Sequence, residues 1–267
     1  MILPKLKRLI HGYKTLSSIL DWRQLYAYTQ EGIALEILFI PDDSAVQTIM
    51  IIAPHPNDEV FGCGGALALH RKRGDAVHVI YLTDGSRGTM SGSRDRSLIA
   101  KREQEAKEGL DILGGAMHQF WRFADGAFAI NKTTVGLLKG QLEKIRPDVV
   151  YIPWFGDDHT DHRAVAPLLF ATTSQFKTPL SFEVRQYEVW APLIPNRLIE
   201  IGDVLKEKIK AMEAHQSQLP KRFHRDGILG LNAYRGAFGG LDDPAEAYLA
   251  LSADRFSHFM SQIVQLP

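Results

Sequence analysis

Short apolar runs and longer stretches with helical spacing alternate along most of this chain. The apolar runs have strand character, as in the run Thr-Ile-Met-Ile-Ile at residues 48–52. The predicted strands cover residues 47–52, 77–82, 118–122, 148–152 and 182–190. The predicted helices cover residues 64–73, 96–113, 133–145, 162–173, 204–215, 244–251 and 253–264.

Strands that alternate with helices in this way predict a mainly parallel sheet that is covered by helices on both faces, with right-handed crossovers. The expected fold class is therefore a Rossmann-like, three-layer α/β/α sandwich. We divide the chain into an N-terminal helical extension, residues 1–46, and a single domain, residues 47–267, which ends in a helical appendage.

The composition is that of an ordinary globular protein, with 267 residues of which 45% are hydrophobic and 23% charged. Lys plus Arg and Asp plus Glu both count 31, so the charge balance indicates no nucleic-acid partner. The single cysteine, Cys63, excludes an intrachain disulfide and favours a reducing, cytoplasmic compartment. The oligomeric state stays open, and an oligomer is compatible with the sequence.

The first twenty residues mix basic and apolar side chains at helical spacing. This mixture is unlike a signal peptide, and the chain has no apolar run of the ~18 residues that a transmembrane helix needs. Two interpretations remain for residues 1–20. The helix either makes peripheral contact with an anionic membrane, at its inner face, or packs on the domain.

Two polar clusters each follow a predicted strand. Residues 53–59 follow the strand 47–52, and residues 159–162 follow the strand 148–152. Ligands bind at this edge of open α/β sheets. His55 and Asp58, on one tight turn, would combine with His162 as three ligands for Zn²⁺ with an open position for water.

Two other interpretations apply to the same residues. His and Asp are common at strand ends and helix starts, where Asp often caps a helix. The glycines at residues 62–65 suggest a nucleotide-binding Rossmann domain without metal, but the sequence Gly-x-Gly-x-x-Gly is absent because Leu67 stands at the third glycine position. We expect these glycines to allow close packing below the site and Cys63 to be a packed thiol.

The motifs themselves resemble a known family. His55-Pro56-Asn57-Asp58-Glu59, followed by Gly62-Cys63-Gly64-Gly65, is similar to the first motif of the PIG-L/LmbE-like N-acetylglucosamine deacetylases, which usually reads His-Pro-Asp-Asp-Glu. Further motifs of that family are resembled in order by Leu82-Thr83-Asp84-Gly85, Arg102-x-x-Glu105, Asp125-Gly126, His159-x-Asp161-His162 and His215-x-Ser217-Gln218.

The resemblance implies an LmbE-like fold and zinc-dependent hydrolysis of the acetyl group of an N-acetylated amino sugar, which is free or linked to a lipid or nucleotide. Carried over by position, the metal ligands would be His55, Asp58 and His162. The substrate-binding residues would be Arg102, Asp125 and Asp84. His159 would be the acid or the oxyanion stabiliser, and Asp161 would orient a histidine.

Asn57 departs from the family pattern, which has aspartate as the general base at this position. An amide accepts no proton at neutral pH, and loss of a base typically costs ~10²–10⁴ in rate. Three interpretations follow for a natural Asn: another base, with Glu59, Asp157 and Asp158 as candidates; a slow enzyme that relies on zinc-bound hydroxide; or a non-catalytic, metal-containing sugar-binding protein. An aspartate exchanged on purpose to trap substrate would give the same sequence.

Two further segments have open roles. The polar loop at residues 84–94 is either a lid over the site or a solvated connector. Trp154 and Phe155 either stack on a sugar ring or belong to the core.

Overall fold

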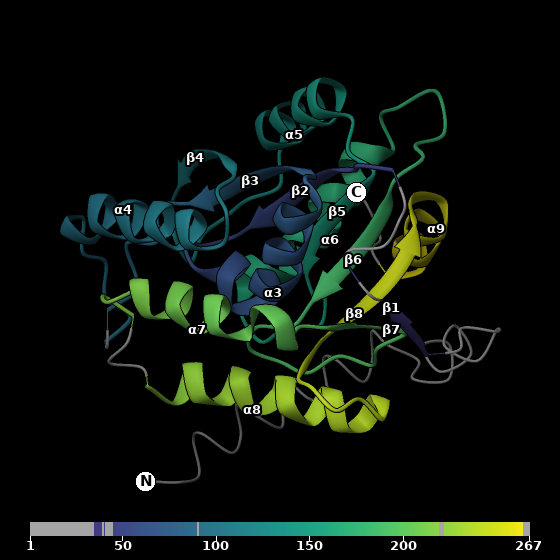
Figure 1. Cartoon of the computed structure of the whole chain (residues 1–267). Helices are drawn as coiled ribbons and strands as arrows, with labels where there is room; N and C mark the ends of the chain where they lie inside the picture. The colour runs from purple at the N-terminus through teal and green to yellow at the C-terminus, as the bar shows by residue number, and fades with distance from the viewer. Residues whose placement is uncertain (1–34, 39, 41–44, 90, 219–221, 264–267) are drawn as a thin grey trace, which may run out of the picture.

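An eight-stranded sheet forms the centre of the protein in the computed structural model, which describes residues 35–38, 40, 45–89, 91–218 and 222–263. The strand order is β1-β7-β8-β6-β5-β2-β3-β4 (Figure 1). Of these strands β8 alone runs antiparallel to its neighbours, and the remaining pairs are parallel. The strands are β1 (Glu36–Leu38), β2 (Thr48–Ala53), β3 (Ala76–Thr83), β4 (Met117–Phe123), β5 (Val149–Pro153), β6 (Glu183–Tyr187), β7 (Arg197–Glu200) and β8 (Ala245–Ser252).

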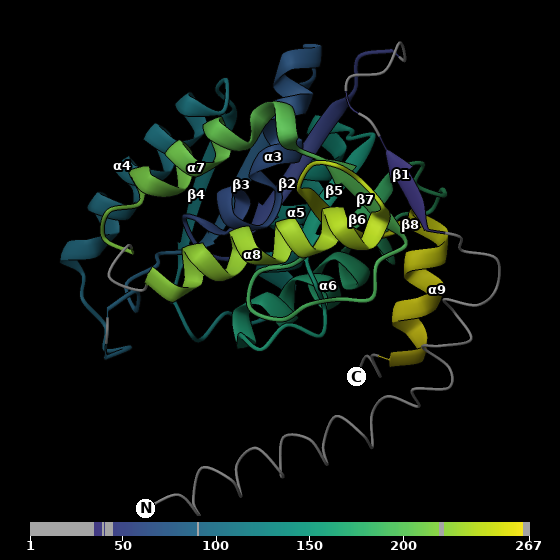
Figure 2. The ribbon, with the colours of Figure 1, turned by 60° about the horizontal axis from the view of Figure 1, so that its bottom comes forward.

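Helices cover both faces of this sheet, as Figure 1 and Figure 2 show. One layer contains α3 (Asp58–Arg73), α4 (Ser97–Ile112), α7 (Leu205–Ala214) with the short 3₁₀ turn Gly202–Val204 before it, and α8 (Arg222–Gly239). The other layer contains α5 (Lys132–Ile145), α6 (Thr160–Thr173) and α9 (Ala253–Ile263). The prediction of a mainly parallel three-layer α/β/α sandwich is confirmed.

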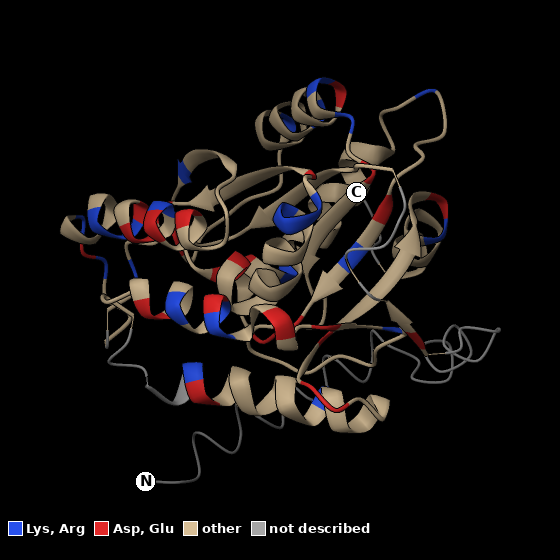
Figure 3. Ribbon diagram, in the orientation of Figure 1, with Lys and Arg blue, Asp and Glu red and all other residues tan. Residues whose placement is uncertain are grey.

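The apolar character of the strands follows from this double cover. In β2, Ile49 and Ile51 pack into the core below one helical layer, whereas Met50 and Ile52 pack into the core below the other. Successive side chains of a strand point to opposite faces, so a strand buried on both faces is apolar at every position. Lys, Arg, Asp and Glu occur along the outer helices α4 and α7 (Figure 3), and α7 packs on α3 and α4.

One predicted helix, residues 244–251, is wrong, because residues 245–251 lie in the strand β8. Its sequence, Ala-Glu-Ala-Tyr-Leu-Ala-Leu-Ser, contains several good helix formers. Pairing with β6 on one side and β7 on the other overrides that local preference, and all but the last residue of β8 are buried. Sequence analysis also missed β1, β7 and α8, and it began α3 at residue 64 instead of Asp58.

The first strand belongs to the segment that the sequence analysis assigned to an N-terminal extension. Glu36–Leu38 pairs with β7 at one edge of the sheet. The helix expected at residues 1–20 lies outside the described residues, and the division at residue 46 stays a prediction. Within the described part of the chain, no helix combines the length and the apolar content needed to cross a membrane.

The glycines in α3 permit close packing below the site, as expected. A Cβ atom at Gly62 would lie 2.2 Å from Cδ2 of Tyr187, and one at Gly65 would lie 2.4 Å from Cγ2 of Ile201. The helix is kinked between them at Cys63, which has φ −141° and ψ 25° and is fully buried. The thiol is therefore a packed core group, as the sequence analysis expected.

We expect Gly62→Ala to lower the free energy of unfolding by about 1–3 kcal/mol, because the added methyl group overlaps the Tyr187 ring. The matched control is Gly136→Ala in α5, where a Cβ would meet nothing within 4 Å. That change should stabilise the helix by about 0.5–1 kcal/mol. Urea unfolding of both variants measures the difference, and equal stability of Gly62→Ala and the unchanged chain would contradict the packing argument.

Candidate functional site

The polar clusters meet where the strand order reverses. β2 pairs with β3 on one side and with β5 on the other. The chain therefore builds the sheet outward from one edge of β2 and later returns to build it outward from the other edge. Such a switch point leaves a crevice at the carboxyl ends of the strands. His55 follows β2 and His162 lies in the first turn of α6, after β5, so the sheet brings together residues that are 107 positions apart.

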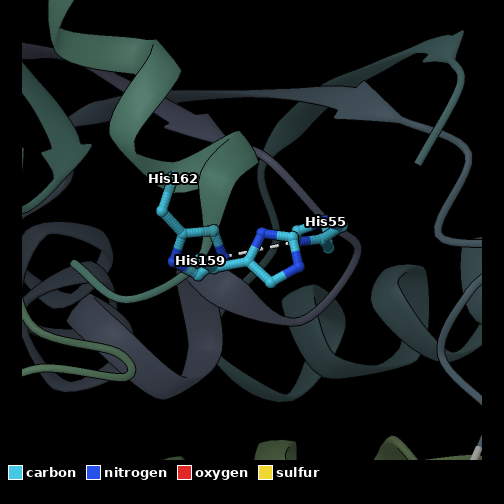
Figure 4. A group of neighbouring side chains, drawn as sticks. All are labelled: His55, His159 and His162. Atoms are coloured by element: carbon cyan, nitrogen blue, oxygen red, sulfur yellow. Dashed lines mark hydrogen bonds between the residues drawn. The ribbon is translucent and has the colours of Figure 1, made fainter. Parts of the chain in front are cut away.

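Three side-chain atoms converge in this crevice. Nδ1 of His55 lies 3.1 Å from Oδ2 of Asp58 and 3.2 Å from Nε2 of His162. The third side of the triangle, from Nε2 of His162 to Oδ2 of Asp58, is 3.2 Å. In Figure 4 a dashed line joins the imidazole rings of His55 and His162, and His159 lies beside them. All three residues of the triangle are at most 7% exposed.

This triangle fits a zinc ion. Ligand atoms around tetrahedral zinc are roughly 3.3 Å apart, since each lies about 2.0–2.2 Å from the metal. Two imidazoles and one carboxylate are also ligand types that catalytic zinc sites use. The ring nitrogens of His55, His159 and His162 form a looser alternative set, within 4.8 Å of one another. We favour the triangle with Asp58 because its three sides are shorter.

The second ring nitrogen of each imidazole, on the side away from the triangle, lies within ion-pair distance of a carboxylate. Nε2 of His55 lies 3.2 Å from Oδ2 of Asp161 and 3.3 Å from Oδ1 of Asp125. Nδ1 of His162 lies 3.3 Å from Oδ1 of Asp157. Carboxylates in such positions select the tautomer and the orientation of a metal-binding histidine. The expectation that Asp161 orients a histidine agrees with this geometry.

His159 caps α6 and lines the pocket. Its Nδ1 accepts a hydrogen bond of 3.2 Å from the backbone N–H of Asp161. In the neutral ring the proton is then assigned to Nε2, which makes Nε2 a hydrogen-bond donor. The ring centroid of His159 lies 4.6 Å from that of His55, close to the triangle.

Asn57 lies next to the triangle in an unusual backbone conformation. Its φ is 144°, which is uncommon for a residue other than glycine and is typical of strained positions at functional sites. Its Oδ1 accepts a hydrogen bond of 2.9 Å from Nη2 of Arg102 on α4. Arg102 also donates to the carbonyl oxygens of Gly85 and Pro56.

The three candidates for a replacement base do not line the pocket. Glu59 is fully buried and bonded to the hydroxyl group of Tyr81 and the backbone N–H of Asn57, and burial raises the pKa of Glu59 to about 8. Asp157 is 1% exposed and accepts hydrogen bonds from the backbone N–H groups of His159 and Trp190. Asp158 is exposed, and it is absent from the described lining residues.

A pocket of about 340 Å³ opens over the triangle. Its described lining residues are His55, Asn57, Asp58, Arg87, Gly88, Gly92, Arg102, Asp125, Gly126, His159, Thr160, Trp190 and Gln218. Trp190 was missed in the sequence because no motif surrounds it, and Arg87 was considered only as part of the loop at residues 84–94. Gln218 was part of a motif and was given no role.

Other expected residues lie elsewhere. Asp84 is absent from the described lining residues, because its carboxylate binds Arg94 at 2.9 Å and the backbone N–H of Ser86 at 3.0 Å. Trp154 and Phe155 are each 8% exposed and pack in the core, so the stacking role was the wrong alternative.

The loop at residues 84–94 borders the pocket through Arg87, Gly88 and Gly92. Its side chains also bond to each other, since Arg94 donates to the Ser86 hydroxyl group at 3.2 Å. Movement of this loop as a lid stays a prediction.

Two motifs that are more than a hundred residues apart in the chain complete the wall of the pocket. Glu105 on α4 accepts hydrogen bonds from the backbone N–H of Ser217, at 2.8 Å, and from its hydroxyl group, at 2.6 Å. This contact places Gln218 at the pocket, where a Cβ on Gly88 would lie 2.8 Å from its Nε2. The motifs Arg102-x-x-Glu105 and His215-x-Ser217-Gln218 are therefore held side by side by hydrogen bonds.

Comparison with known proteins finds several deacetylases and also a hydratase, 4-oxalmesaconate hydratase from Pseudomonas putida, which is 28% identical over 110 residues and covers 39% of this chain and 42% of that protein. The PIG-L family, described as GlcNAc-PI de-N-acetylase, matches residues 50–172. The chain is 28% identical over 191 residues to diacetylchitobiose deacetylase from Thermococcus kodakarensis, covering 66% of this chain and 72% of that protein. It is 28% identical over 205 residues to a probable N-acetyl-alpha-D-glucosaminyl L-malate deacetylase 2 from Bacillus anthracis, covering 67% of this chain and 88% of that protein.

A solved structure has the same fold. N,N'-diacetylchitobiose deacetylase from Pyrococcus horikoshii superimposes with a TM-score of 0.70 and 22% identity, over 87% of this chain and 93% of that chain. The homologues thus include deacetylases of N-acetylglucosamine-containing substrates, and the described residues contain a His/Asp cluster suited to a metal ion.

The two possible donor sets can be separated with a matched pair of variants. His162→Asn removes a member of the triangle, and we expect it to lose most of the bound zinc. His159→Asn keeps a capping side chain at the start of α6 and should retain close to one zinc ion per chain. Elemental analysis after dialysis measures both, and loss of zinc from His159→Asn would favour the three-histidine set instead.

Proposed function

This chain belongs to the PIG-L/LmbE-like deacetylase family, and we propose that it is a zinc-dependent hydrolase that removes the acetyl group from an N-acetylated amino sugar. The observation that carries the proposal is the triangle of His55, Asp58 and His162, whose sides of 3.1 and 3.2 Å suit one metal ion. The names of the homologues support deacetylation, and the pocket above the triangle has room for a sugar ring.

In the proposed site, His55, Asp58 and His162 hold the ion, and Asp161 and Asp157 fix the two imidazole rings. A bound Zn²⁺ supplies Lewis acidity for the acetyl carbonyl and lowers the pKa of its water toward ~7. His159 lines the pocket and presents Nε2–H, which suits a hydrogen bond to the developing oxyanion; in its imidazolium form it would protonate the leaving amine and return to the neutral ring.

Substrate contacts in the proposal come from Arg102 and Asp125, which both line the pocket. Oδ2 of Asp125 accepts a hydrogen bond of 2.8 Å from the backbone N–H of Arg87, so the carboxylate is fixed where it can accept from a sugar hydroxyl group. Trp190 is 46% exposed at the rim, and its ring is of the kind that packs on the apolar face of a sugar.

The general base of the reaction, or its absence, determines the expected rate of hydrolysis. Asn57 donates and accepts hydrogen bonds but takes up no proton, and the other described carboxylates that line the pocket are Asp58 and Asp125. Asp58 belongs to the proposed metal set. We therefore propose a slow enzyme that relies on metal-activated water. The rival function is a sugar-binding protein that keeps the metal and does not turn over.

Two points of cell biology remain proposals. We place the protein in the cytoplasm. Residues 1–20, which lie outside the described part of the chain, either pack on the domain or contact the inner face of the membrane. Co-sedimentation of the full chain with anionic vesicles tests the contact, and a chain that stays in the supernatant would remove it.

The deciding variant for the enzyme is Asn57→Asp. We expect the zinc-loaded variant to release acetate from N-acetylglucosamine and its simple glycosides at least ~10² times faster than the unchanged chain, because it regains a base. Asp158→Asn is the control and should leave the rate unchanged. Equal rates for Asn57→Asp and the unchanged chain would place the base elsewhere, and no acetate from either protein despite bound zinc would favour the sugar-binding rival.

A further inference from the structure

Arg102 is a buried cation without a carboxylate partner. It is 3% exposed, and its hydrogen bonds go to three neutral acceptors, the carbonyl oxygens of Gly85 and Pro56 and Oδ1 of Asn57, at 2.8, 3.0 and 2.9 Å. No described carboxylate lies within the 4.0 Å of an ion pair with it. Nε of Arg102 has no hydrogen-bond acceptor among the described residues.

The other buried arginines of the described chain each have a carboxylate partner. Arg185 pairs with Glu183 at 2.6 Å, and Arg235 pairs with Glu188. A buried charge is costly unless a counter-charge accompanies it. Burial accordingly lowers the pKa of Arg102. Nearby carboxylates, Asp58 and Asp125 among them, offset this effect only in part. The lining of this pocket therefore contains a guanidinium group that makes no direct ion pair with a described carboxylate.

Neighbouring groups in the pocket are also donors. A guanidinium group only donates hydrogen bonds, so Oδ1 of Asn57 must face it and the amide NH₂ of Asn57 points away from it. Arg87 lines the same pocket, is exposed, and makes no ion pair with a described residue. Gln218 adds a further amide next to Gly88.

Both carboxylates that line the pocket already have partners other than Arg102. Oδ2 of Asp58 lies between the imidazoles of His55 and His162 and also accepts the backbone N–H of His55 at 2.7 Å. Asp125 accepts the backbone N–H of Arg87 and faces His55. Neither is within ion-pair distance of Arg102, so the donors beside Arg102 are left for a ligand.

We infer that Arg102 and Asn57, with Arg87 at the entrance, form an anion subsite that takes a carboxylate or phosphate group of the ligand. An aspartate at position 57, as in the family motif, would itself supply the counter-charge of Arg102. Asn57 keeps the hydrogen bond but leaves the charge to the ligand. As regards substrate class the inference rests on the proposed function: among N-acetylated amino sugars, the pocket selects those with an anionic group.

Calorimetric titration of the zinc-loaded full chain with sodium acetate, and separately with inorganic phosphate, tests the subsite without turnover. We expect saturable binding of at least one anion. Asn57→Asp should weaken that binding at least about tenfold, because its own carboxylate would pair with Arg102. Arg255→Gln, which removes an exposed arginine of α9, is the control for total charge and should bind as the unchanged chain does.

The two anions distinguish the sources of the charge. Tighter acetate points to a sugar acid or carboxylate-bearing aglycone, and tighter phosphate points to a phosphorylated sugar. Arg102→Gln should also lose binding, but it removes three hydrogen bonds. Asn57→Asp is therefore the deciding variant. Equal binding by Asn57→Asp and the unchanged chain would place the anion on the metal or elsewhere and overturn the inference, as would no binding of either anion.

Failure of the subsite and failure of the proposed function give different results. Binding that depends on Asn57, with no acetate release from any variant, would keep the subsite and remove the hydrolase. Acetate release with no anion binding would keep the hydrolase and remove the subsite. If both hold, the ratio of kcat/KM for phosphorylated over neutral N-acetylglucosamine should fall in Asn57→Asp, because the new carboxylate repels the anion.

Discussion

The close approach of Asp58 to two imidazoles is the interaction on which the site depends. Three buried polar atoms lie within 3.2 Å of one another, so each imidazole nitrogen of the cluster either carries a proton that it donates to Asp58 or is left to bind a cation. Such a cluster is costly in a protein interior unless a cation or shared protons compensate it. The sheet makes the cluster possible, because β2 and β5 are neighbours and end at the same edge.

Groups far from the pocket hold that edge in place. The kink at Cys63 leaves backbone N–H groups of α3 without helical partners, and the carboxylate of Glu246 on β8 accepts those of Gly65 and Ala66. Lys208 on α7 neutralises the same carboxylate at 2.6 Å. The middle of α3, the helix that begins at Asp58, is thus joined to β8 and α7 through hydrogen bonds to one buried ion pair.

Position 57 connects the chemistry of the site with its electrostatics. Exchange of a carboxylate oxygen for an NH₂ group removes a proton acceptor and, in the same step, a counter-charge for Arg102. The proposed slow hydrolysis and the proposed anion subsite are two consequences of this one difference. The first concerns the water on the metal, and the second concerns the group that a ligand places beside Arg102.

Local pattern determined much of this protein: the alternation of strands and helices predicted the parallel sheet, and residues after two strands predicted the cluster of His55, Asp58 and His162. Long-range pairing decided the rest. Residues 245–252 include several helix-forming side chains and become β8 because β6 and β7 pair with its two edges. Arg87 and Trp190 reach the pocket only through the folding of their loops, and Asp84 is withdrawn from it by Arg94. Spacing in a sequence reports which side chains share a turn or a strand end, whereas burial and the choice of partner between distant segments depend on the packed sheet, so only the tertiary structure showed that the Arg102 charge is unpaired.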